Sequence, residues 1–81
     1  MNGWVVKITK AGDFTVPKLY AIAESDPRRA LFLVNQAVNG SPPQDRVETA
    51  GELSADEVRH LGLAPNEIRD VTADPPLTDR F

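Results

Sequence analysis

The sequence contains no cysteine and only one histidine. The absence of cysteine excludes a disulfide framework, a thiolate metal site and a cysteine nucleophile. Small secreted domains usually depend on disulfides, because a short chain buries too little surface to be stable without them. The lack of cysteine therefore favours a domain that folds on its hydrophobic core alone.

Long hydrophobic runs are also missing. The apolar stretch near the N-terminus ends at Lys7, too early to form the core of a signal peptide, and no later stretch reaches the length of a membrane span. Hydrophobic residues make up 41% of the chain and charged residues 26%, which is an ordinary globular composition. We predict a soluble, cytoplasmic protein without membrane contact.

The net charge of −3 is unevenly distributed along the chain. Residues 1–40 carry five basic and three acidic side chains, whereas residues 41–81 carry four basic and nine acidic ones. A solvated surface with an uneven sign is the simplest interpretation. The same asymmetry also suits head-to-tail association, or an acidic surface that meets a basic partner.

Alternation and turn chemistry predict an antiparallel hairpin in the first part of the chain. Residues 4–9 form the first strand, and Gly12 within residues 10–13 supplies the turn. The second strand runs from about Phe14 or Val16 to Ala23, and its residues 19–23 are apolar on both faces, as is typical of an interior strand. The first strand is expected to be half buried, with one face formed by Trp4, Val6 and Ile8 and the other by Val5, Lys7 and Thr9.

A long amphipathic helix is predicted to follow. Asp26 or Ser25 caps its start, Pro27 occupies its first position, and the helix ends near Asn39 and Gly40. Helical spacing places the apolar side chains on the face that covers the sheet. These residues are Ala30, Leu31, Leu33, Val34, Ala37 and Val38.

The second half of the chain predicts a strand, a short helix and one further short element. Residues 45–53 alternate and should form a strand near an edge of the sheet. Ser54 and Glu57 match a capping box, and Gly62 ends the short helix that follows. Residues 67–71 are either a short edge strand or one helical turn, and we favour the strand.

The predicted fold is an α+β two-layer sandwich with the order β-β-α-β-α and a possible final strand. Its main amphipathic helix packs on the sheet. Residues 1–71 form one domain. Residues 72–81 contain Pro75 and Pro76, show no periodicity and are expected to be a mobile tail.

Phe32 does not fit the amphipathic pattern of the long helix. Its helical angle places the ring opposite the apolar face, among polar residues. Either residues 42–43 or the tail through Leu77 and Phe81 cover this ring, or it is the centre of a protein interface. The predicted interface consists of Phe32 with Arg28, Arg29, Asn35 and Gln36.

The segment 56–71 resembles the helix-turn-helix pattern of bacterial DNA-binding proteins. In this resemblance Gly62 takes the turn, Val58 lies at the tight contact between the helices, and Ile68 anchors the second helix. His60 departs from the pattern, because an apolar residue usually stands there. The segment carries two basic and four acidic residues, whereas duplex DNA requires local positive charge.

Other candidate sites carry less information. Trp4 and Tyr20 could form a stacking platform for bases or a small ligand, although packing under the helix is the simpler interpretation, and we favour it. His60 lies three and four residues after Glu57 and Asp56, but no third ligand for a metal is evident. We predict no catalytic residues, no metal and no cofactor.

The sequence thus predicts a small non-enzymatic domain that works by protein contact, either as a homodimer or as an accessory subunit. A nucleic-acid-binding protein that uses residues 56–71 or the Trp4 and Tyr20 face is the second interpretation. A ligand-binding or enzyme subunit whose site forms on oligomerisation is the third.

Overall fold

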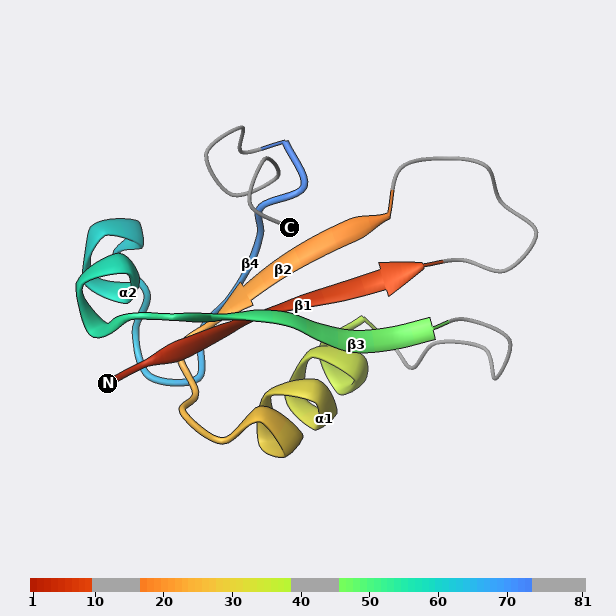
Figure 1. Cartoon of the computed structure of the whole chain (residues 1–81), viewed down its shortest axis with the longest axis horizontal. Coiled ribbons are helices and arrows are strands. Elements are labelled where there is room, and N and C mark those ends of the chain that lie inside the picture. The colour runs from red at the N-terminus through yellow and green to blue at the C-terminus, as the bar shows by residue number, and fades with distance from the viewer. Residues whose placement is uncertain (10–16, 39–45, 74–81) are drawn as a thin grey trace.

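The computed structural model describes residues 1–9, 17–38 and 46–73. Along the chain, its elements are β1 (Gly3–Thr9), β2 (Lys18–Ile22), α1 (Pro27–Ala37), β3 (Arg46–Leu53), α2 (Ala55–Leu61) and β4 (Ile68–Asp70). The strands form one sheet in the order β3-β1-β2-β4, and every neighbouring pair is antiparallel (Figure 1). The predicted α+β class and order of elements are confirmed.

The pairing of β1 with β2 confirms the predicted antiparallel arrangement. Trp4 lies opposite Ile22, and Ile8 lies opposite Lys18. The turn predicted at residues 10–13 lies outside the described residues. Because β3 also runs antiparallel to β1, β2 and β3 point in the same direction, and α1 carries the chain from one to the other.

The two edge strands agree with the sequence prediction. β3 is one edge of the sheet, and residues 68–70 form the other edge as a strand rather than a helical turn. The register between β1 and β3 shifts at one point, where Gly51 lies opposite Val5 but Thr49 lies opposite Val6. Ala50 is therefore the extra residue of a β-bulge in the β3 edge.

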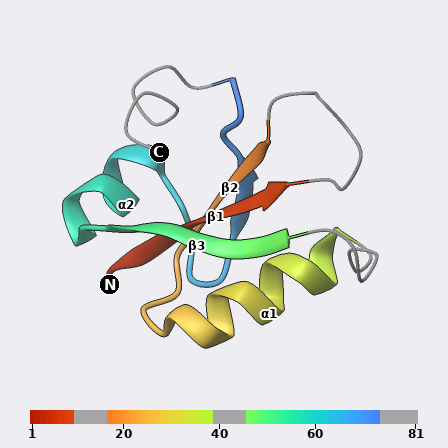
Figure 2. The same ribbon diagram turned by 45° about the vertical axis from the view of Figure 1, so that its right-hand side comes forward.

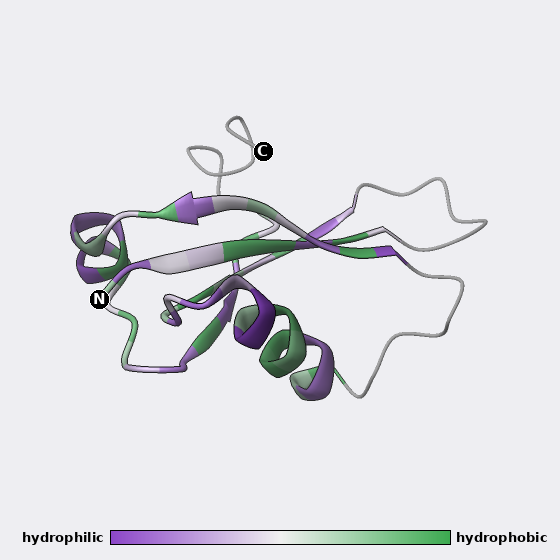
Figure 3. Cartoon of the chain, turned by 60° about the horizontal axis from the view of Figure 1, so that its bottom comes forward, coloured by the Kyte–Doolittle hydropathy of each residue, from purple (hydrophilic) through white to green (hydrophobic). Residues whose placement is uncertain are grey.

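The sheet has a hydrophobic cluster on each face. Helix α1 covers one face, and its cluster consists of Val6, Ile8, Ile22, Ala30 and Val34. Figure 2 shows α1 lying along this face and α2 at one end of the molecule, and the hydropathy colours of Figure 3 mark hydrophobic residues on both helices. The cluster on the other face consists of Val5, Leu19, Ala21, Ala23, Leu53, Val58, Leu63 and Val71.

One expectation for β1 is wrong. A half-buried strand predicts one exposed face, yet Val5, on the face that also carries Lys7 and Thr9, has an exposed fraction of 0%. The reason is tertiary, because α2 and the residues after it bring Val58 and Leu63 onto this face. The alternation of residues within β1 alone cannot predict the burial of Val5.

Gly3 allows α2 to approach the sheet closely. A Cβ atom at this position would lie 2.4 Å from the carbonyl oxygen of Ile22 and 2.9 Å from a methyl group of Val58. Both distances are shorter than van der Waals contact, so the side chain of alanine does not fit without movement of the backbone or of α2.

The predicted helix starts are confirmed. Asp26 is the N-cap of α1, and Ser54 is the N-cap of α2 within a complete capping box. Gly62 ends α2 in the left-handed conformation with a φ of 70°, as predicted. Helix α1 ends at Ala37 with Val38 as its C-cap, about half a turn before the predicted end at residues 39–40, which lie outside the described range. Neither helix in this part of the chain is long and apolar enough to span a membrane.

Candidate interaction surface

Helix α1 presents one buried side and one exposed side. Ala30 and Val34 face the sheet with exposed fractions of 0%. Phe32 lies on the opposite side and is 64% exposed. Across residues 1–9, 17–38 and 46–73, only Phe32 and Met1 are exposed large hydrophobic residues. The predicted outward position of Phe32 is therefore confirmed.

The apolar face of α1 is narrower than predicted. Leu31, Leu33 and Val38 are half-buried and pack against the cluster, but Ala37 is exposed. Ala37 is the last residue of the helix. The covered stripe is centred on Ala30 and Val34, on the side of the helix opposite Phe32.

The four polar residues predicted around Phe32 are its nearest neighbours on the helix surface. Arg28 and Gln36 lie four residues before and after Phe32, and Arg29 and Asn35 lie three residues before and after it. Arg28, Arg29 and Gln36 are exposed, and Asn35 is half-buried. We call these five residues the outer face of α1.

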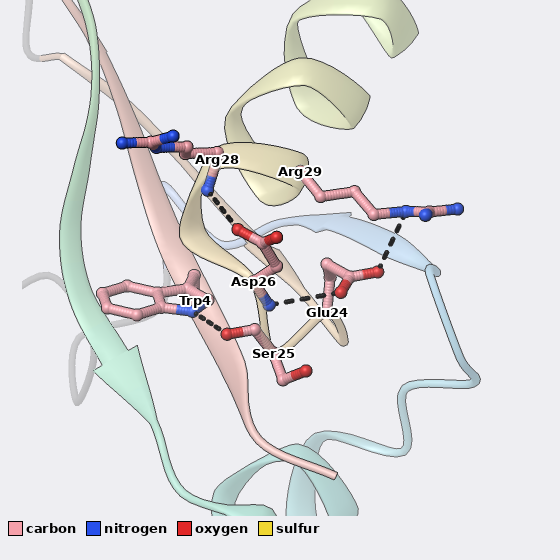
Figure 4. A network of polar contacts seen from close by, with 6 residues as sticks. All are labelled: Trp4, Glu24, Ser25, Asp26, Arg28 and Arg29. Carbon is pink, nitrogen blue, oxygen red and sulfur yellow. Dashed lines mark hydrogen bonds and ion pairs between the residues drawn. The ribbon is translucent and has the colours of Figure 1, made fainter.

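A hydrogen bond fixes the start of α1 to the sheet. The indole N–H of Trp4, on β1, donates to the backbone carbonyl oxygen of Ser25 at 2.9 Å (Figure 4). Ser25 directly precedes the N-cap residue of α1. The sequence analysis did not predict this contact, because it joins residues 21 positions apart and no local pattern marks it.

Glu24 and Asp26 organise the first turn of α1. The carboxylate of Asp26 accepts from the backbone N–H of Arg28 at 2.9 Å, which satisfies one of the free N–H groups at the helix start. The Glu24 carboxylate accepts from the backbone N–H of Asp26 at 3.2 Å and pairs with the guanidinium of Arg29 at 3.4 Å (Figure 4). Glu24 was also missed, although an acidic residue close before a helix with two arginines was a usable signal.

Two basic side chains, Arg28 and Arg29, and two acidic ones, Glu24 and Asp26, lie at the start of α1. The first turn of the helix contains Arg28 and Arg29 and no acidic residue. The helix dipole places partial positive charge at this end, which the N-cap carboxylate of Asp26 stabilises and the two arginines oppose. Arg29 is compensated by Glu24, whereas no ion pair of Arg28 is formed with another described residue.

Trp4 and Tyr20 do not form an open platform. Both lie on the side of the sheet that α1 covers, and both are half-buried against its cluster. Trp4 lies opposite Ile22 and Tyr20 lies opposite Val6, so the two aromatic residues are two register positions apart. They pack beside the helix, as the simpler of the two interpretations predicted.

The segment that resembles a helix-turn-helix forms only the first helix. Gly62 makes the predicted turn, but Ile68–Asp70 is strand β4, which pairs with β2. His60 is exposed, and the neighbouring Asp56 pairs with Arg59 at 3.9 Å. Over the ranges that the structure describes, no three histidine or acidic side chains gather where they could hold a metal ion.

A second polar network connects α2 to β4. Arg69 donates to the carbonyl oxygen of Leu61 at the end of α2 and to the carboxylate of Glu67 at 3.1 Å. Glu67 also accepts from the backbone N–H of Ala64 at 2.9 Å. This backbone hydrogen bond, together with Arg69, holds the pKa of Glu67 below its ordinary value of 4.5.

Compared with protein-family models, curated proteins and solved structures, the chain gives no significant match. The functional argument therefore depends on the outer face of α1 alone.

Proposed function

We propose that this protein is a small non-enzymatic domain that acts by protein contact and self-associates through the outer face of α1. The observation that carries the proposal is the exposure of Phe32, which is 64% accessible at the centre of four polar residues. Aromatic anchors surrounded by arginine and amide side chains are typical of interface hot spots. We infer a cytoplasmic location from the absence of cysteine.

Burial of Phe32 against a partner supplies a driving force. Fully burying a phenylalanine side chain contributes about 1.5–3 kcal/mol relative to leaving it in water. In a symmetric dimer this contribution is made twice, because each copy provides one ring. The monomer leaves this hydrophobic area in contact with water.

The edges of the sheet are less suited to association. Strand β3 carries a β-bulge at Ala50 and charged residues such as Glu48 and Glu52, and both features oppose pairing with another strand. Strand β4 is only three residues long. The outer face of α1 is therefore the surface that best supports self-association.

Sedimentation analysis of the wild type and of Phe32→Ala tests the proposal. We expect a concentration-dependent dimer for the wild type and an affinity at least about 30-fold weaker for the variant, which corresponds to a hot spot of about 2 kcal/mol. Circular dichroism should be unchanged, because Phe32 makes no core contact. His60→Ala, at an exposed position on α2, is the matched control and should keep the wild-type affinity.

Two results would reject the proposal: a wild type that is monomeric at all accessible concentrations, or a dimer whose affinity is unchanged by Phe32→Ala. High salt should weaken this dimer only slightly, because an aromatic ring forms its centre. A complex with nucleic acid that dissociates steeply with salt, without any self-association, would replace the proposal by the second interpretation.

A further inference from the structure

We infer that the occupant of the outer face is α1 of a second copy, packed antiparallel about a two-fold axis that passes close to Phe32. The inference rests on the proposed self-association. Phe32 is the middle residue of α1, which spans Pro27–Ala37. A two-fold axis perpendicular to the helix at this residue brings the two rings together and leaves five helical residues on each side of each ring.

This symmetry places complementary groups opposite each other. The residue four positions before Phe32 then faces the residue four positions after it in the second copy, so Arg28 faces Gln36 of the second copy, and the reverse. The guanidinium has donors and no acceptor, whereas the amide oxygen of glutamine accepts. Two copies of α1 are thus complementary to each other when they pack antiparallel.

The arrangement also keeps the arginines of the two copies apart. Positions 28 and 36 are eight residues apart, which corresponds to about 12 Å along a helix. The Arg28 side chains of the two copies are separated by this distance, and it exceeds the Debye length of about 8 Å at physiological ionic strength. A parallel arrangement would instead place Arg28 and Arg29 of both copies side by side.

The helix dipole favours the antiparallel arrangement. Arg28 and Arg29 are near the positive end of their own helix, and the last turn of α1 contains no basic residue to offset its negative end. In the antiparallel pair, the arginines of one copy lie beside the negative end of the other helix. The antiparallel pair therefore adds a favourable dipole interaction that the monomer lacks.

The absence of cysteine in the natural sequence allows a direct test by disulfide cross-linking. Arg28→Cys and Gln36→Cys are prepared as two single variants of the full chain, mixed in equal amounts and oxidised. We expect at least a tenfold excess of the mixed disulfide over either homodisulfide, because only positions 28 and 36 come within the 4.4–6.8 Å between Cα atoms that a disulfide requires. His60→Cys on α2 is the control and should not cross-link with either variant.

The outcomes separate this inference from the proposal on which it rests. A prominent homodisulfide of Arg28→Cys would show parallel packing and overturn the inference. So would the absence of cross-links in a mixture that sediments as dimers, or cross-links from either cysteine to His60→Cys, which would indicate head-to-tail contact with α2. In these cases self-association stands. A wild type that sediments as a monomer overturns both.

Discussion

The two helices of this protein distribute their charges in opposite ways. Helix α2 has Asp56 and Glu57 in its first turn and Arg59 and His60 in its last turn, as the helix dipole favours. Helix α1 has two arginines in its first turn, and no basic residue in its last. The charges on both ends of α2 thus stabilise its own helix dipole, whereas at α1 only the N-cap carboxylate of Asp26 does so.

The buried sides of the helices also differ. Helix α1 presents Ala30 and Val34 to the sheet over its whole middle part, whereas α2 has one buried residue, Val58. A helix of seven residues is too short to be stable alone, so α2 depends on its caps, on the packing of Val58 and Leu61, and on the hydrogen bond from Arg69 to Leu61. Substitutions next to α2 and substitutions on the exposed side of α1 should therefore change the free energy of unfolding by different amounts.

The largest effect is expected from Gly3→Ala, which removes the close approach of α2. The new methyl group would lie 2.4 Å from a backbone oxygen of β2 and 2.9 Å from Val58, so we expect the free energy of unfolding to fall by about 2–3 kcal/mol. Urea denaturation measures the change. The matched control is Gly62→Ala, whose Cβ meets open space but whose φ of 70° costs about 1 kcal/mol. Equal losses for the two variants would contradict the proposed role of Gly3.

A smaller effect is expected from reversing the charge at the start of α1. In a Phe32→Ala background, where association does not contribute, Arg28→Glu should stabilise the monomer by about 0.5 kcal/mol, because the negative charge suits the helix dipole. Gln36→Glu, near the other end of α1, should destabilise it by a similar amount. The midpoints of urea denaturation give both values. If Arg28→Glu lowered the midpoint, the comparison between the two helices would fail.

The smallest effect concerns the link between α2 and β4. The pKa of Glu67 is lower in the folded protein than in the unfolded chain, so the unfolded chain binds more protons as the pH falls, and the stabilisation from this group is lost. The stabilisation is complete above about pH 5 and disappears as the pH falls through the folded pKa. Glu67→Gln should therefore lose less stability than the wild type between pH 5 and pH 3, as measured by urea midpoints. Parallel curves for the two proteins would contradict this.

Asp70 also makes the free energy of unfolding fall in acid. Its contribution remains in the Glu67→Gln variant, whose stability therefore still depends on pH. Hydrogen bonds from the side chain and the backbone of Thr72 lower the pKa of Asp70 below the ordinary value of 3.8. The Glu67→Gln variant should therefore retain a residual loss of stability in acid.

Much of the fold could be predicted because its signals are local. Ser54 and Glu57 define the start of α2 within four residues, and Gly62 defines its end. Asp26 and Pro27 mark the start of α1 in the same way. The burial of Val5 could not be predicted, because it depends on Val58 and Leu63, which lie more than fifty residues away and return to the sheet only in the folded chain.

Part of the outer face of α1 could be predicted, because its signal is also local. Helical spacing alone places Phe32 outward among its polar neighbours. The contacts of Glu24 and Trp4 that fix the start of this helix are not periodic. These contacts could not be predicted, because they depend on how β1 lies relative to the residues between β2 and α1. Only the three-dimensional structure shows this arrangement.

The central claim is that the outer face of α1 is the contact surface between copies, and a dilution series followed by residue-resolved NMR tests it most directly. Between high and low protein concentration, we predict that the amide resonances of Arg28, Phe32 and Gln36 shift together along one binding curve, while those of α2 and β3 stay fixed. Shifts confined to α2 or to the β3 edge, or spectra that do not change with concentration, would contradict the claim.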